Sequence, residues 1–199
     1  MNTPSHVILN LALLGRRSQS HLNSPIFWGA MLPDLAMFGF YGWAKLIAKM
    51  DEATIWREAY YEPFWQDIFD AGNSIPLALL VIGIALWSKK SYPHWKPLTD
   101  AAIFLAASVI LHCLADLPLH VDDGHRHFWP FSNFRFESSI SYWDPDHHGG
   151  LAALGEFLLV LLASWRVWQL LRSRWLRLLL IGSNGLMWLF YASFYLQGI

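Results

Sequence analysis

One pair of side chains has the spacing of a metal half-site. His112 and Asp116 are four residues apart in an apolar stretch, which places both on one face of a helix. An imidazole and a carboxylate one helical turn apart form half of a site for Zn²⁺ or a similar ion. Since ionisable groups in an apolar segment need a partner, the pair predicts a metal site or, as the alternative, a hydrogen-bonded polar contact without an ion.

A second group of candidate ligands follows directly. Six of the nine histidines lie between His112 and His148. After the pair come His120, Asp122, Asp123, His125 and His127. In an extended chain His125 and His127 point the same way, so both imidazoles could reach one metal. The alternative is a solvated, histidine-rich loop. Further along, Glu156 is a buried carboxylate that needs a proton, a partner or a metal.

The composition indicates the elements that must position these groups. The chain has 199 residues, of which 55% are hydrophobic and 15% charged, whereas a soluble domain carries about a quarter charged residues. We therefore predict an all-α integral membrane protein with about four transmembrane helices. Twelve tryptophans fit rings at membrane interfaces. The net charge of −1 indicates no nucleic-acid partner.

The apolar runs divide a single membrane domain, 1–199, into two parts. Segment 1–73 is predicted to be re-entrant or interfacial, with a short in-plane helix at 7–14. Stretch 26–47 has spanning length but contains Pro33 and Asp34, so it is functional or not a simple span. Segment 74–199 forms the four-helix core. Its predicted spans are 75–87, 101–119, 151–171 and 176–196, with a long loop at 120–150.

The basic residues predict the orientation. Lysines 89, 90 and 96 lie between the first two predicted spans, and arginines 172, 174 and 177 between the last two. Positive charge favours the cytoplasmic side. We therefore expect a multi-pass protein of the inner (plasma) membrane, whose loop 120–150 lies on the non-cytoplasmic side.

Four stretches together resemble the YdjM-like family of membrane-bound, metal-dependent hydrolases. They are Thr3-Pro4-Ser5-His6, Gly29-Ala30-Met31-Leu32-Pro33-Asp34, His112-Cys113-Leu114-Ala115-Asp116 and Trp129-Pro130-Phe131-Ser132. Their order and spacing match over roughly the first two-thirds of the chain. The resemblance implies that His6, Asp34, His112 and Asp116 are metal ligands.

The chain departs from the family pattern at one position. Asn73-Ser74 stands where the family has His-Ser before a span. Asparagine is a poor ligand for zinc. The departure therefore implies fewer metal ions, compensation by His120, His125 or His127, or a member that has lost catalysis.

A catalytic site of this kind would use one or two Zn²⁺ ions. His6, His112 and Asp116, with Asp34 or His120, would hold the metal, whose bound water is acidified. A free carboxylate among Asp34, Asp122 and Asp123 would take its proton. His125, His127 or Arg126 would stabilise the oxyanion or protonate the leaving group. A phosphoester is the preferred substrate bond, on a lipid or other amphiphile at the membrane face.

Two other classes of function fit the same residues. A non-catalytic membrane subunit of a larger complex would use the cluster as a structural metal clamp. A metal-handling protein would bind a transition ion in the outward loop for delivery or transport. Beside the lipid bilayer, the expected partners are therefore an amphiphilic substrate or other membrane subunits.

Overall fold

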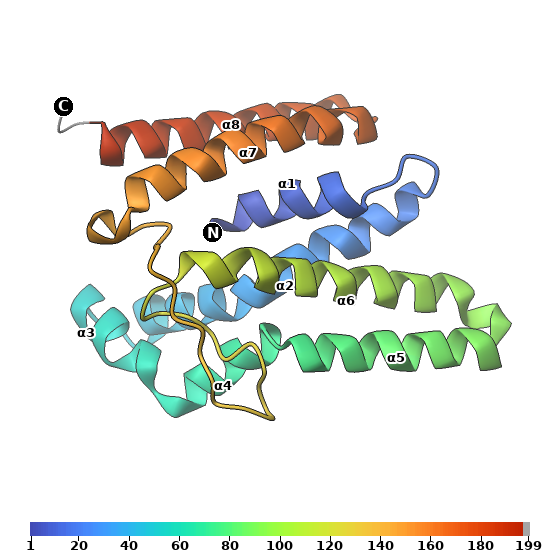
Figure 1. Cartoon of the computed structure of the whole chain (residues 1–199), viewed down its shortest axis with the longest axis horizontal. Coiled ribbons are helices and arrows are strands. Elements are labelled where there is room, and N and C mark those ends of the chain that lie inside the picture. Colours follow the sequence, from blue (N-terminus) through green and yellow to red (C-terminus); the bar gives the residue numbers. More distant parts are fainter. Residues whose placement is uncertain (197–199) are drawn as a thin grey trace.

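The computed structural model describes residues 1–196, which form eight α-helices and no strand (Figure 1). The predicted all-α class is confirmed. Short 3₁₀ and π turns separate some helices, and the segment from 120 to 144 has no regular structure. The helices are α1 (Thr3–Leu14), α2 (Asn23–Gly42), α3 (Glu52–Arg57), α4 (Pro63–Gly72), α5 (Ile75–Ser91), α6 (Lys96–Asp116), α7 (Gly149–Leu170) and α8 (Arg174–Tyr195).

Three helical segments of residues 1–196 are long and apolar enough to cross a membrane: Pro93–Leu119, Gly149–Leu170 and Arg174–Tyr195. The predicted span at 75–87 is α5, which has 17 residues and by itself is shorter than the usual ~20. Helices α4 and α5 are long and apolar enough to span a membrane only when they are taken together, and they meet at a bend of 42°. Up to four spans result, depending on whether this bent pair is one of them.

The ambiguous stretch 26–47 is α2 followed by a π-helical turn, Trp43–Ile47. It is not among the three candidate spans. Helix α2 packs against α6 so closely that a Cβ added at Gly29 would lie 2.2 Å from the Leu105 carbonyl oxygen. Glycine at this position lets the two backbones touch, as is common where helices pack in membranes. This close contact sets Asp34 of α2 beside the end of α6.

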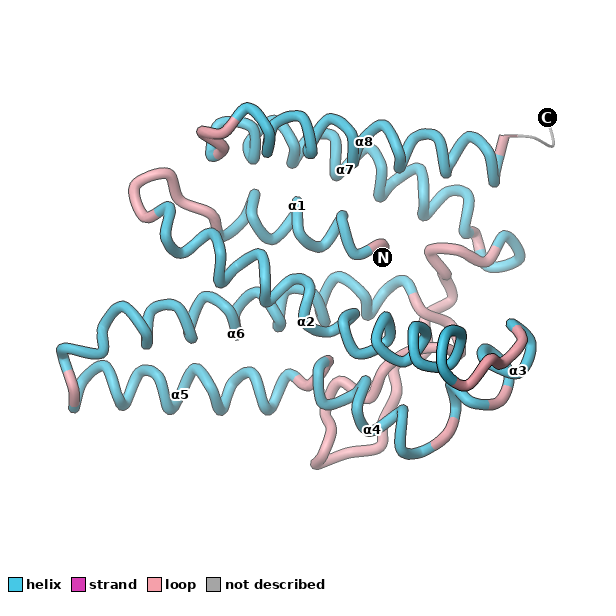
Figure 2. Tube along the Cα trace, turned by 180° about the vertical axis from the view of Figure 1, so that it is seen from behind, coloured by secondary structure: helices cyan, strands magenta, loops and turns pink. Residues whose placement is uncertain are grey.

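Helix α1 lies between the α2/α6 pair and the α7/α8 hairpin (Figures 1 and 2). A buried polar contact fixes the position of α1 along α2 and α6. The Asn10 side chain donates to the Ser108 carbonyl and hydroxyl, each at 2.8 Å, and the Ser108 hydroxyl donates to the Ile26 carbonyl at 2.6 Å. The contact ties α1 and the start of α2 to α6. The short helix predicted at 7–14 is α1, which extends over Thr3–Leu14.

Apolar contacts complete the packing in three clusters. Aromatic rings of α2, the α3 region and α4 meet around Phe40 and Phe69. Small residues of α5 and α6, among them Ala78 and Ala106, allow close approach of those two helices. Ile8 and Ala12 of α1 pack on Val160, Val167 and Leu180 of α7 and α8. The C-terminal hairpin thus reaches the rest of the molecule chiefly through α1.

Figure 1 shows the two ends of the molecule clearly. The α1–α2, α5–α6 and α7–α8 turns lie at one end. The N-terminus, the end of α6 and the loop from 120 to 144 lie at the other. The turns carry Arg16, Arg17, Lys89, Lys90 and Arg172. The loop end carries the histidines and aspartates that the sequence singled out.

Candidate metal centre

Helices α2 and α6 bring two carboxylates to one imidazole. His112 Nε2 is 3.1 Å from Asp116 Oδ2 and 3.6 Å from Asp34 Oδ1. The other ring nitrogen, Nδ1, donates a hydrogen bond to the Ala30 carbonyl at 2.8 Å. In the neutral ring that bond leaves Nε2 with a lone pair facing two negative groups. Such an arrangement of acceptors requires a cation or an added proton.

Helix α1 adds a second imidazole to the group. The His6 and His112 rings stack with centroids 3.6 Å apart and both are fully buried. His6 Nε2 is 3.0 Å from Asp116 Oδ1, which also accepts a hydrogen bond from the Met1 amino group at 2.8 Å. Thr3 donates to Asp34 Oδ2 at 2.5 Å. Two protonated rings would repel at this distance.

Three of these side chains lie close enough together that they could hold a metal ion. One ligand atom each from His6, Asp34 and His112 lie within 4.8 Å of one another. Around a tetrahedral zinc with ligands at about 2.0–2.2 Å, donor atoms are roughly 3.3 Å apart. The hydrogen bond from His112 to a carbonyl is also the usual support for a ligating histidine. Nitrogen and carboxylate donors suit Zn²⁺ or a similar transition ion.

A buried glutamate on α7 holds the start of α1. Glu156 Oε1 accepts hydrogen bonds from the Asn2 backbone and side-chain nitrogens at 2.9 and 3.0 Å and from the Ser5 hydroxyl at 2.5 Å. The first N–H groups of a helix lack helical partners, so a carboxylate there is favourable. Glu156 therefore orients the turn that carries His6 and is not itself in the His6, Asp34 and His112 group.

His120 joins the group from the loop. Its Nε2 is 3.6 Å from Asp116 Oδ1, and its Nδ1 is 3.0 Å from Asp123 Oδ1. Burial lowers the pKa of His120, but the contacts with the two carboxylates outweigh it and raise this pKa to about 9. The Trp143 indole donates to Asp123 Oδ2 at 3.1 Å. At neutral pH His120 is therefore a cation fixed beside the carboxylates.

The other loop residues that the sequence singled out lie at different distances from His120. The His125 ring centroid is 6.2 Å from that of His120. His127 is buried, donates from Nδ1 to the His125 carbonyl at 2.9 Å, and has no partner for Nε2 among residues 1–196. Burial and the nearby His125 lower the pKa of His127 to about 4. Asp122 is exposed.

Asn73 is buried, and its amide nitrogen donates to the Phe69 carbonyl.

The structure reveals one ionic network that the sequence analysis missed. Asp70 of α4 is fully buried and accepts from the Arg126 backbone N–H at 2.9 Å and from its guanidinium. The same guanidinium donates to Asp67 at 2.6 Å, and Arg135 lies 3.8 Å from Asp70. These contacts tie the loop to α4. The only sign of this network in the sequence was Asp70 itself, an acid within the segment predicted to be interfacial.

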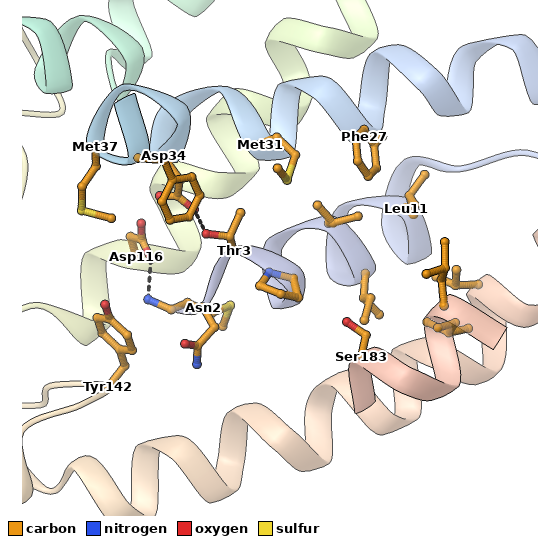
Figure 3. A pocket seen from close by; sticks show the side chains of 18 of the residues that line it. Asn2, Thr3, Leu11, Phe27, Met31, Asp34, Met37, Asp116, Tyr142 and Ser183 are labelled. Atoms are coloured by element: carbon orange, nitrogen blue, oxygen red, sulfur yellow. Dashed lines mark hydrogen bonds and ion pairs between the residues drawn. The ribbon is translucent and has the colours of Figure 1, made fainter. Parts of the chain in front are cut away.

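A cavity of about 680 Å³ leads from these groups into the helices (Figure 3). Asp34, Asp116, His120 and His125 line its polar end, together with Tyr142, which the sequence analysis did not select. The backbone N–H of Tyr142 donates a hydrogen bond to the Leu119 carbonyl at 3.0 Å. No local sequence pattern predicts this contact. The remaining walls come from α1, α2, α7 and α8.

No protein-family model, curated protein or solved structure matches this chain.

Proposed function

We propose that this chain is a membrane-embedded, metal-dependent hydrolase of the YdjM-like kind, acting at the membrane face on a phosphoester or lipid-linked substrate. One observation carries the proposal: the free lone pair of His112 Nε2 faces the carboxylates of Asp34 and Asp116. His6, Asp34, His112 and Asp116 would hold the ion, zinc or another divalent transition metal. When bound, such an ion supplies Lewis-acid chemistry and acidifies a bound water.

The residues of the chain provide the remaining functions. His120 contacts the carboxylates of Asp116 and Asp123, which favour the protonated form of its ring. It stands at the polar end of the cavity, where it would attract the anionic group of a phosphoester and stabilise developing charge. Asp123 orients that ring through Nδ1. Asp34, held by Thr3, lines the same cavity, and where His6, His112 and Asp116 hold the ion without it, Asp34 is the nearest candidate for a proton acceptor.

The distribution of charge supports a membrane location with the loop outward. The three apolar segments run between an end rich in arginine and lysine and an end rich in aspartate and histidine. Arg16 and Arg17 of the α1–α2 turn add to the basic residues at 89, 90 and 172. Under the positive-inside rule that end faces the cytoplasm. Labelling of a cysteine placed at position 90 from outside the cell, without labelling at 127, would overturn this orientation.

The complete burial of both imidazoles supports a second candidate, a structural metal clamp in a non-catalytic membrane subunit. The two candidates differ in one respect. A structural site is closed, whereas a catalytic site keeps an exchangeable position. Asp34, Asp116 and His120 line the cavity, so we favour the catalytic candidate.

Metal analysis and a hydrolysis assay on the full chain test the proposal. The protein is purified without metal-affinity steps, its transition metals are quantified, and release of nitrophenol from bis(p-nitrophenyl) phosphate is followed with and without a chelator. We expect bound metal, chelator-sensitive hydrolysis, and loss of both in His112→Gln but not in His147→Gln, an exposed loop histidine. Metal without hydrolysis would favour the clamp. Equal and negligible metal in all three proteins would contradict both candidates.

A further inference from the structure

The cavity changes character along its length. Its polar end holds the carboxylates and His120, while the far end is walled by Leu11, Phe27 and apolar residues of α7 and α8 (Figure 3). Ser183 is the one polar side chain on the α8 wall. A pocket with reactive groups at one end and hydrocarbon walls at the other has the polarity of an amphiphile.

The length and volume of the cavity limit what fits. Lining residues on α1 run from Asn2 to Leu11, which at 1.5 Å per residue is about 13 Å. A methylene group is about the size of a water molecule, ~30 Å³, so a volume of about 680 Å³ holds roughly twenty such groups. This is room for one alkyl chain with its head group and too little for two long chains.

The walls also select the chemistry of the occupant. A peptide carries N–H and C=O groups that cost free energy when they lack partners in an apolar site. On α7 and α8 the lining residues other than Ser183 are apolar, so a peptide backbone there would find almost no hydrogen-bond partners. An alkyl chain needs no hydrogen bonds, and each buried methylene favours binding.

The α7/α8 side of the cavity adjoins surface suited to lipid. The outward side chains of this hairpin are large and apolar, and Leu162 is 75% exposed. Leu179 lines the cavity and is itself exposed, so the wall is continuous with that apolar surface. A chain from the bilayer can enter there without crossing a polar barrier.

We infer that the cavity between α1, α2 and the α7/α8 hairpin binds one acyl chain of an anionic single-chain lipid, with its phosphate beside His120. This rests on the proposed function for the chemistry at the polar end, and it names the substrate class: a lysophospholipid or another alkyl phosphoester. The chain lies along α1 towards Leu11 and Leu171.

Photo-crosslinking of the full chain in non-ionic detergent tests the inference. The probe is a lysophosphatidic acid with a diazirine at the end of a ten-carbon chain, whose length matches the cavity, and labelled peptides are mapped by mass spectrometry. We expect labels on α1 near Leu11 and on α8 near Leu176. Competition by unlabelled lysophosphatidic acids should weaken about tenfold for every two carbons removed from the chain.

Matched variants separate the cavity from the outer surface. Val7→Trp and Leu179→Trp place a large ring in the cavity, while Leu162→Trp places the same ring on the outer face of α7. We expect at least about a tenfold loss of labelling in the first two and none in the third. Using two cavity variants keeps the test valid if one of them fails to fold.

Labelling does not depend on turnover, which separates this inference from the proposed function. Site-specific labelling that persists with a chelator and without hydrolysis would support the lipid site while the hydrolase proposal falls. Labels spread evenly over the outer faces of α7 and α8, or unchanged by Val7→Trp and Leu179→Trp, would overturn the lipid site even in an active, metal-loaded enzyme.

Discussion

Two ionisable clusters lie at the loop end of the molecule and differ in how their negative charge is balanced. The Asp70 cluster consists of Asp67, Asp70, Arg126 and Arg135, in which two carboxylates meet two guanidinium groups. The Asp116 cluster consists of His6, Asp34, His112, Asp116 and His120, in which two carboxylates meet three imidazoles and the Met1 amino group but no arginine or lysine.

The difference separates a structural role from a chemical one. In the Asp70 cluster each buried charge has its opposite partner, so the network fastens the loop and leaves no position for an ion. In the Asp116 cluster the lone pair of His112 faces carboxylates, which a metal would satisfy. Four predictions test this contrast, ordered from the largest expected effect to the smallest.

Asp116→Asn should abolish stoichiometric metal binding, an effect larger than the 10- to 100-fold typical of residues that only support ligands. Asp116 contacts both His6 and His112, so its loss removes a ligand and a charge together. Asp144→Asn is the matched control, because Asp144 only caps a loop turn and pairs with His147. Metal titration of the two variants is the measurement. Equal affinities would make the Asp116 cluster an ordinary polar contact.

Arg126→Met should lower the free energy of unfolding by about 3 kcal/mol while leaving metal content unchanged. Loss of the guanidinium group removes the main charged partner of the Asp70 carboxylate, which is fully buried. Arg57→Met is the control, since Arg57 is exposed. Thermal unfolding in detergent and metal analysis are measured together. Loss of metal with unchanged stability would reverse the roles of the two clusters.

Gly29→Ala should destabilise the protein by about 2 kcal/mol and weaken metal binding as well. The added Cβ would meet the Leu105 carbonyl at 2.2 Å and push α2, with Asp34, away from α6. Gly39→Ala on the same helix meets nothing within 4 Å and should be neutral or slightly stabilising. Destabilisation by Gly29→Ala without any change in metal affinity would show that the site tolerates movement of α2.

His127 should make the free energy of unfolding fall by roughly 1.6 kcal/mol as the pH drops from 6.5 to 5. Burial and His125 lower its pKa from 6.5 to about 4 in the folded state, so the unfolded chain binds more protons over that interval. His127→Gln keeps a donor for the His125 carbonyl and should flatten this part of the profile. Unfolding midpoints at several pH values measure it, and parallel profiles for the two proteins would contradict the assignment.

Much of the fold could be predicted from local pattern. Apolar runs predicted the helices at 101–119, 151–171 and 176–196, which correspond to α6, α7 and α8. The helix bounds between residues 1 and 73 could not be predicted as closely, because polar residues and Pro33 interrupt the apolar runs there. A four-residue spacing also placed His112 and Asp116 on one face, because helical geometry fixes such neighbours without help from the rest of the chain.

Only the tertiary structure decided which distant groups join that pair. His6 and Asp34 reach His112 because Gly29 lets α2 touch α6, while Asn10 and Glu156 hold α1 in place. The resemblance to a family had suggested their grouping, but neither periodicity nor composition implies it. The partnership of Asp70 with Arg126 could not be predicted from local pattern either, because an acid in a polar segment does not indicate its partner. In apolar helices every face is hydrophobic, so hydrophobic pattern marks the helices and leaves their pairing to close packing and a few buried polar contacts.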